Sequence, residues 1–222
     1  MATSPLVLQK LLNICSQYAE EFELKFNVKK TKCLIFLPNC YNDLALPRFY
    51  LSGMKIETVK DIKYLGCYIT DSLSDDKDIS RIVRSIYSRG NTIIRKFYMC
   101  TENVKIKLFI SFCTSFYGLA NLSNFSQDSF RKISVAYKRI FRGFFMFKCD
   151  YDDVKRTSFH MLNRKIRPFP VIERNILHGF YTRVSGSTND IVMAVFNCLY
   201  FNNSRFLTRY YNTVYLNQSA FR

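Results

Sequence analysis

Apolar positions near the amino terminus repeat with the period of an α-helix. Ser4 followed by Pro5 is a typical helix start, because an N-cap hydroxyl accepts from the first turn and proline already has a helical φ. Apolar side chains then recur at intervals of three and four residues. They are Leu8, Leu11, Leu12, Cys15, Ala19 and Phe22. The pattern predicts one amphipathic helix whose apolar face carries all six side chains.

Short apolar runs replace the helical period beyond this helix. The run at 33–37 is followed by a proline and predicts a buried strand. Runs at 49–51 and 54–56 flank a Ser-Gly pair, which predicts a hairpin turn between two short strands. A further run at 64–70 contains a glycine and predicts one more short strand.

Helices dominate the pattern from Asp75 onward. A long amphipathic helix is predicted after this residue from a continuous apolar stripe. The stripe comprises Ile79, Ile82, Val83, Ile86, Tyr87, Gly90, Ile93, Ile94 and Phe97. Further helices are predicted over 104–117, 126–145 and 191–201. The segment 167–170, which contains two prolines, predicts a break in any helix near it.

This distribution predicts an α+β fold with three regions, and the charge is unevenly shared among them. Residues 1–72 contain the strands and carry a net charge of +2, whereas the helical regions 73–146 and 147–222 carry +8 and +6. The whole chain has a formal charge of +16 and a pI near 9.6. Such an excess favours a polyanionic partner that shares the charge with the helical part.

Two classes of location are not expected from the sequence. The apolar stretch 108–120 contains polar residues and is shorter than the ~18 apolar residues of a membrane span, so we expect no membrane partner. The first residues lack the basic start and apolar run of a secretion signal. We therefore expect an intracellular protein, nuclear or cytoplasmic, whose eight cysteines form no disulfides.

The residue types of metal and thiol sites are sparse or poorly spaced. There are two histidines and no C-x-x-C pair, so we expect no zinc site and no thiol catalysis. The sequence Tyr151-Asp152-Asp153 invites comparison with the paired carboxylates that hold magnesium in polymerases. Basic, helix-like segments flank it, which favours a solvated acidic loop instead.

Two basic clusters are candidates for contact with phosphates. Lys29, Lys30 and Lys32 precede an apolar run, at what would be one end of a sheet. The second cluster surrounds Tyr137 and Phe141 and consists of Arg131, Lys132, Lys138, Arg139 and Arg142. Aromatic residues among cations suit nucleic acid, but these two aromatics also occupy core positions of a helix. The pattern alone leaves phosphate contact and a solvated helix face open for both clusters.

Residues 11–19 and 24–36 closely resemble the reverse transcriptases of non-LTR (LINE-like) retrotransposons, just after their catalytic strand hairpin. In that family this helix and an N-x-x-K-[TS]-K strand form the fourth palm motif. The segment Lys63-Tyr64-Leu65-Gly66-Cys67-Tyr68-Ile69 resembles the next motif, a hairpin that supports the primer end. Residues 79–97 and 136–142 resemble the thumb and the region that follows it.

The resemblance implies a fold and a set of binding residues. Residues 1–72 would be the end of a palm, made of short antiparallel strands and one helix; 73–146 would be a helical thumb and 147–222 a helical extension. Lys30 would be the catalytic palm lysine that helps protonate the departing pyrophosphate. The implied nucleic-acid contacts are Lys29 and Lys32, the primer-supporting Tyr64, Leu65 and Gly66, the thumb residues Arg81, Arg84 and Arg95, and Lys138, Arg139 and Arg142 in the later segment.

The resemblance also implies what this chain lacks. The family holds magnesium with an aspartate of an early palm strand and with the paired aspartates of an A-D-D-type hairpin, all of which would precede Met1. We therefore expect a reverse-transcriptase fragment with no cofactor of its own and no polymerase activity alone. Its expected partners are RNA and an RNA–DNA template–primer duplex. Two alternatives stay open: a non-catalytic protein that binds RNA or RNA–DNA, and a remnant that folds poorly.

Overall fold

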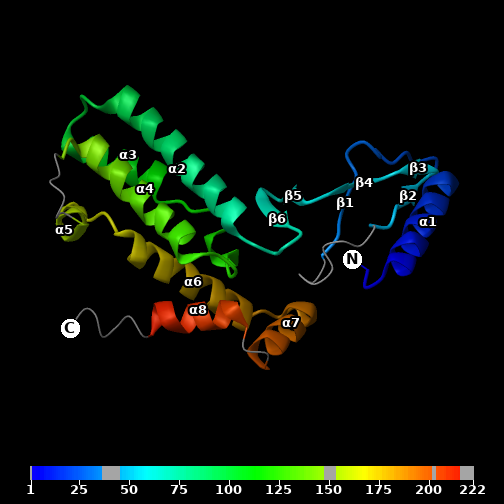
Figure 1. Cartoon of the computed structure of the whole chain (residues 1–222). Coiled ribbons are helices and arrows are strands. Elements are labelled where there is room, and N and C mark those ends of the chain that lie inside the picture. The colour runs from blue at the N-terminus through cyan, green and yellow to red at the C-terminus, as the bar shows by residue number, and fades with distance from the viewer. Residues whose placement is uncertain (1, 37–45, 148–153, 202–203, 216–222) are drawn as a thin grey trace. The chain divides into compact units, whose positions relative to one another are not determined.

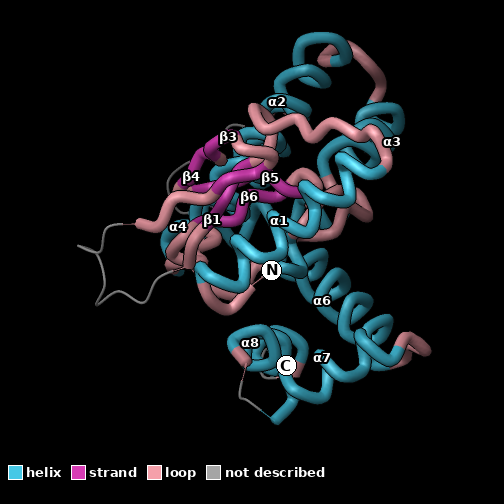
Figure 2. The backbone as a smooth tube through the Cα atoms, turned by 90° about the vertical axis from the view of Figure 1, so that its right-hand side faces the viewer, coloured by secondary structure: helices cyan, strands magenta, loops and turns pink. Residues whose placement is uncertain are grey.

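The chain has an α+β fold that divides into two compact units, Met1–Ser74 and Asp75–Arg222 (Figure 1). The structure is a computed structural model that describes residues 2–36, 46–147, 154–201 and 204–215. All strands within these ranges belong to the first unit, where Figure 2 shows them in magenta.

The first unit begins with helix α1, Pro5–Glu21, at the predicted position. The Ser4 hydroxyl accepts a hydrogen bond from the Val7 N–H at 3.3 Å, as expected of an N-cap serine followed by proline. The helix ends after Glu21, where the Phe22 N–H still donates to a carbonyl of the last turn. Local sequence therefore defines the start of this helix.

The buried face of α1 is narrower than predicted. Leu8 and Leu12 pack against a small core formed by Phe49, Leu51 and Ile56. A second set of contacts is polar: the Gln9 amide exchanges hydrogen bonds with the Tyr50 backbone, and the Ser16 hydroxyl accepts from the Ser52 N–H. The prediction was wrong for Leu11, Cys15 and Phe22, which are exposed. The core beneath α1 is too small to cover a stripe of that width.

The strands form three separate two-stranded sheets. They are the parallel pair β1 (Lys32–Leu34) and β4 (Glu57–Val59), the antiparallel hairpin β2 (Tyr50–Leu51) and β3 (Met54–Lys55), and the antiparallel hairpin β5 (Asp61–Tyr64) and β6 (Cys67–Thr70). The hairpin predicted around the Ser-Gly pair is confirmed. The single strand predicted over 64–70 was wrong, because the chain turns at Leu65-Gly66 and the first arm of the hairpin starts at Asp61.

Helices α2 (Asp76–Phe97), α3 (Glu102–Cys113) and α4 (Gln127–Phe145) form the main body of the second unit. α2 and α4 run side by side in the same direction, and α3 runs in the opposite direction and packs against both (Figure 1). The Asp75 carboxylate ties the two starts together by accepting from the Ser123 and Asn124 N–H groups at 2.6 and 2.7 Å.

The core of this bundle is the apolar stripe predicted from the sequence, packed against aromatic side chains. Ile79, Ile82, Ile86 and Ile93 of α2 are buried. The ring of Phe109 on α3 lies 5.4 Å from that of Tyr137 and 5.6 Å from that of Phe141 on α4, in tilted and edge-on arrangements. The predicted helices α2 and α4 are confirmed, whereas α3 ends at Cys113, before the predicted end at 117.

Four more helices follow within the described residues: α5 (Val154–Asn163), α6 (Phe169–Ser185), α7 (Asp190–Phe201) and α8 (Arg205–Val214). Only α7 is predicted by the apolar pattern. The break expected at 167–170 is confirmed as a helix boundary, since α5 ends at Asn163 and α6 starts at Phe169 with Pro168 as its N-cap and Pro170 in its first turn. Proline is tolerated there, since the first backbone N–H groups of a helix have no intrahelical partner.

A buried arginine docks α8 against α6 and the short 3₁₀ helix η2 (Leu119–Asn121). Arg209 donates to the carbonyls of Leu119 and Leu122 at 3.0 and 2.6 Å and pairs with Glu173 of α6 at 3.0 Å. Its guanidinium also lies 4.9 Å from the centre of the Phe130 ring. Burial lowers the pKa of Arg209 and raises that of Glu173, so desolvation outweighs their mutual attraction.

Candidate nucleic-acid interface

Two segments of the helical unit contain cations and no acidic residue. From Ile79 to Phe97 on α2 and from Ser129 to Phe147 on and after α4, every charged side chain is a lysine or an arginine. Those on α2 are Arg81, Arg84, Arg89, Arg95 and Lys96, and those on α4 are Arg131, Lys132, Lys138, Arg139 and Arg142. The contacts of each side chain decide which of them are available to an anionic partner.

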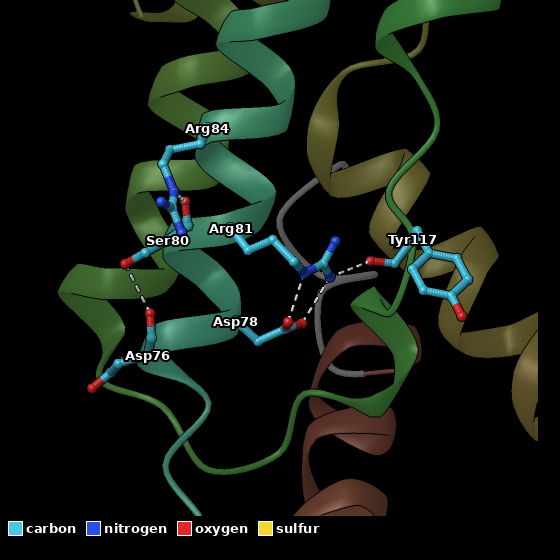
Figure 3. A network of polar contacts seen from close by, with 6 residues as sticks. All are labelled: Asp76, Asp78, Ser80, Arg81, Arg84 and Tyr117. Carbon is cyan, nitrogen blue, oxygen red and sulfur yellow. Dashed lines mark hydrogen bonds and ion pairs between the residues drawn. The ribbon is translucent and has the colours of Figure 1, made fainter. Parts of the chain in front are cut away.

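Arg81 is held by contacts within the protein. Its Nε and Nη2 donate to the two carboxylate oxygens of Asp78 at 2.7 and 2.8 Å, and Nη2 also donates to the Tyr117 carbonyl at 3.0 Å (Figure 3). The Arg81 side chain is 18% exposed and that of Asp78 is 3% exposed. The bidentate pair orients Arg81, and the bond to Tyr117 links the segment after α3 to α2, so the structure favours a structural role for Arg81.

Arg84 and Arg95 project from the exposed side of α2. The Arg84 side chain folds back along its helix, where Nε lies 3.4 Å from the Ser80 carbonyl (Figure 3). Arg95 lies in the last turn and is exposed. Neither residue forms an ion pair with any residue in the described part of the chain. Both guanidinium groups therefore remain available to phosphates.

The cations of α4 differ in exposure. Arg131, Lys132 and Arg139 are exposed, whereas Lys138 and Arg142 are half-buried. Burial, and then the neighbouring charge of Arg142, lower the pKa of Lys138. Lys138 and Arg142 are therefore less suited to an exposed phosphate contact than the first three.

Helical geometry gathers four of these cations on one side of the α2–α4 pair. Each residue turns an α-helix by about 100°. Arg84 and Arg95 follow the packed residues Val83 and Ile94, while Lys132 and Arg139 precede Ile133 and Ile140 of the core. The two helices run in the same direction. A residue that follows a packed position on α2 and one that precedes a packed position on α4 therefore lie on the same side of the helix pair, away from α3. We call Arg84, Arg95, Lys132 and Arg139 the basic face.

One polar residue that the charge pattern does not reveal lies beside the basic face. Asn91 is exposed on α2 and lies two turns after Arg84 and one turn before Arg95, on the same side of the helix. Its amide offers hydrogen-bond donors to a phosphate or sugar. A search for charged residues passes over it, although helical spacing from the two arginines would have found it.

The residues expected to support a primer end are together at the tip of the β5–β6 hairpin. Leu65 and Gly66 form its two-residue turn, with φ values of 46° and 85°. Positive φ at both positions is the geometry that joins twisted antiparallel strands. Tyr64 and Leu65 are 60% and 74% exposed. The tip thus presents an aromatic and an aliphatic group to solvent.

The three lysines of the predicted palm motif are placed differently from one another. Lys29 and Lys30 are exposed in the turn after α1, where the Lys30 N–H donates to the Asn27 side chain at 3.2 Å. Lys32 lies on β1, and its ammonium group pairs with Glu57 on β4. Lys29 and Lys30 are thus exposed in the same turn, whereas the charge of Lys32 is engaged across the sheet.

The carboxylates described by the structure do not fit the magnesium site of the resembling family. Two-metal chemistry needs carboxylates that converge on one point. The carboxylates that lie nearest to one another in the described sequence are those at the start of α2, and they have other partners. Asp75 accepts from two backbone N–H groups, and Asp78 binds Arg81. No group of three or more metal-ligating side chains forms among the described residues. Tyr151-Asp152-Asp153 lies outside the described part of the chain.

The described residues contain neither a disulfide nor a helix suited to crossing a membrane. Their cysteines are free thiols, and burial raises the pKa of Cys113 to about 11, so this thiol stays protonated. None of the helices in these ranges has both the length and the apolar character needed to cross a membrane. Comparison with protein-family models, with curated proteins and with solved structures finds no match for this chain.

Proposed function

We propose that the helical unit binds the phosphate backbone of a nucleic-acid duplex through the basic face. The observation that carries this proposal is the set of four exposed cations on adjoining parallel helices, in segments without acidic residues and with no ion pair to any described residue. Exposed cations that no carboxylate neutralises attract a polyanion and release its counterions on binding.

The spacing of the basic face suits a phosphate backbone. Arg84 and Arg95 are separated by three helical turns, or about 16 Å at 1.5 Å per residue, and Lys132 and Arg139 by about 10 Å. Phosphates follow one another at about 3.4 Å of axial rise along a strand, so each pair spans several of them. Contacts of this kind position a duplex and carry no sequence information.

We also propose, from the resemblance, that the chain is the end of the palm and the thumb of a non-LTR retrotransposon reverse transcriptase. The exposed Lys30 and the hairpin tip at Tyr64, Leu65 and Gly66 support this proposal by their accessibility. In such a polymerase Lys30 would serve the departing pyrophosphate and the tip would support the primer. The partners are then RNA and RNA–DNA template–primer.

A salt series on the full chain tests the binding proposal. The affinity for a labelled RNA–DNA duplex is measured by fluorescence anisotropy, and log affinity should fall linearly with log salt, with a slope near −0.9 for each phosphate neutralised on a B-form duplex. The test variant replaces all four residues of the basic face with glutamine. It should weaken binding and reduce the magnitude of the slope by about 1 for each of the four phosphate contacts removed.

The matched control removes the same charge from exposed lysines of the first unit: Lys10, Lys25, Lys55 and Lys60 to glutamine. This control should retain more affinity than the basic-face variant and a steeper slope. Equal losses in the two variants would show that only net charge matters and would contradict the assignment of the basic face.

A primer-extension assay addresses the polymerase proposal. The full chain, supplied with magnesium, deoxynucleotides and an annealed RNA–DNA template–primer, should bind the substrate without extending it. The reason is the order of the motifs. The sequence contains two pairs of adjacent aspartates, Asp75-Asp76 and Asp152-Asp153. Both pairs follow the primer-supporting motif, whereas the catalytic pair of the family precedes the lysine motif. Extension of the primer would overturn this part of the proposal.

A further inference from the structure

A cavity of about 470 Å³ lies between α3, α6 and the segment that leads into α6. Its lining consists of Ile110, Thr114, Lys165, Arg167, Ile172, Asn175 and Ile176. The volume is within the range of about 300–1,000 Å³ that is usual for small-molecule sites. The cavity therefore has the size of a ligand site, and its lining indicates the chemistry.

Two cations at the cavity are carried by a firmly held backbone. Lys165 and Arg167 line the cavity on either side of Ile166, whose side chain is fully buried. The Ile166 N–H donates to the Met161 carbonyl at 2.9 Å, and the buried Tyr137 hydroxyl donates to the Arg167 carbonyl at 2.9 Å. The backbone that carries both cations is thus held in place at the edge of the cavity.

The charge at the cavity is uncompensated. None of its lining residues is acidic, and neither Lys165 nor Arg167 forms an ion pair with a residue that the structure describes. Lys107 lies one turn before Ile110 on the exposed side of α3 and adds a third positive charge nearby. This arrangement favours an anion, and a lysine and an arginine together suit a phosphate.

The remaining lining is of a different character. The isoleucines at 110, 172 and 176 form an apolar wall, and the Asn175 amide provides both a donor and an acceptor beside it. An inorganic anion such as phosphate would gain no binding energy from contact with an apolar wall. A nucleotide unites an anionic phosphate with a flat base whose faces are apolar and whose edge forms hydrogen bonds.

We propose that this cavity binds a nucleoside monophosphate, with the phosphate between Lys165 and Arg167 and the base against the isoleucines beside Asn175. The site is separate from the basic face, and its ligand is a single nucleotide rather than a duplex backbone. Its success or failure is therefore independent of duplex binding by Arg84, Arg95, Lys132 and Arg139.

The test uses the full chain with labelled isoleucine methyl groups, titrated with adenosine 5′-monophosphate and uridine 5′-monophosphate and followed by NMR. Signals of Ile110, Ile172 and Ile176 should shift saturably with at least one of these nucleotides. Uridine, adenosine and inorganic phosphate, each alone, should bind with an affinity lower by about tenfold or more. The proposal would be overturned if neither nucleotide gave a saturable shift, or if inorganic phosphate alone bound as tightly as the nucleotides.

Two variants remove the phosphate contacts without disturbing the fold. Lys165 has a φ of 57°, so Lys165→Asn keeps a residue that tolerates this backbone, and Arg167 is exposed, so Arg167→Gln is also mild. Each should weaken nucleotide binding by about 10- to 100-fold, as expected for loss of a charge-assisted hydrogen bond.

The matched control is Arg183→Gln, which removes a charge from the same helix α6 outside the cavity lining. It should leave nucleotide affinity unchanged. The basic-face variant should also retain nucleotide affinity while losing duplex affinity, which keeps the two proposals distinguishable. Equal losses in Arg183→Gln and Arg167→Gln would refute the assignment of the cavity as the site.

Discussion

Gly90 of α2 lies directly against the side chain of Ile140 of α4. A Cβ atom at position 90 would be 2.6 Å from Cδ1 and 2.7 Å from Cγ1 of Ile140, closer than two carbon atoms can approach. The absence of a side chain at this point allows the two helices to pack closely along their length. The basic face depends on this contact, because it draws its cations from both helices.

We expect Gly90→Ala to destabilise the helical unit. Alanine favours an isolated helix by about 1 kcal/mol over glycine, but overpacking a core costs about 1–3 kcal/mol. The net effect should be a loss of unfolding free energy, measured by urea denaturation. The loss should be smaller on an Ile140→Ala background, because that change removes all three side-chain atoms that crowd position 90. Gly179→Ala is the control, since nothing lies within 4 Å of a Cβ there. A stabilised Gly90→Ala would contradict the close contact.

Arg81→Gln should destabilise the protein more than Arg84→Gln. Removal of Arg81 leaves the buried Asp78 carboxylate without its bidentate partner, and breaking a buried pair costs on the order of 3 kcal/mol. Arg84 is exposed, and changes at such positions are usually within about 0.5 kcal/mol. Chemical denaturation of both variants measures the difference, and similar values would argue against the structural role of Arg81.

Glu173 should make the protein less stable as the pH rises above about 4.5. Burial raises its pKa from the ordinary value of 4.5, so the folded state holds the proton at pH values where the unfolded state has released it. Stability therefore falls through the interval between the two pKa values.

Unfolding measured across this interval for the natural protein and for Glu173→Gln checks the prediction. The variant keeps hydrogen-bonding groups for Arg209 but has no titrating proton, so the decline should be smaller. An unchanged profile would show that Glu173 does not contribute to the pH dependence.

Leu65→Asn should stabilise the β5–β6 hairpin. Leu65 has a φ of 46°, which is unfavourable for a leucine, whereas Asn-Gly is the preferred pair for a turn with two positive φ values. We expect a gain of about 0.5–1 kcal/mol in unfolding free energy. If the exposed Leu65 contacts a primer end, the same variant should bind template–primer less tightly. Leu73→Asn, also at positive φ but outside this hairpin, controls for exposed leucines in general.

Local sequence was sufficient for the elements that are defined by nearby residues. The Ser4-Pro5 start of α1, the Ser52-Gly53 turn and the stripe of α2 are all present. Helix caps, two-residue turns and apolar stripes involve interactions over a few residues, which a sequence pattern records directly. The same reasoning placed a helix boundary at Pro168 and Pro170, but it did not identify the segment as the start of α6, because a proline near the first turn begins a helix as readily as it breaks one.

The sequence by itself determined the α+β class, the two parallel-running helices as separate elements and the excess of positive charge in the helical part. The tertiary structure alone decided which cations are free. It placed Asp78 and the Tyr117 carbonyl against Arg81, buried Arg209 beside Glu173, and left Arg84 on the surface. Ion pairs and cavities join residues far apart in the chain, and their geometry follows from packing that no local periodicity encodes.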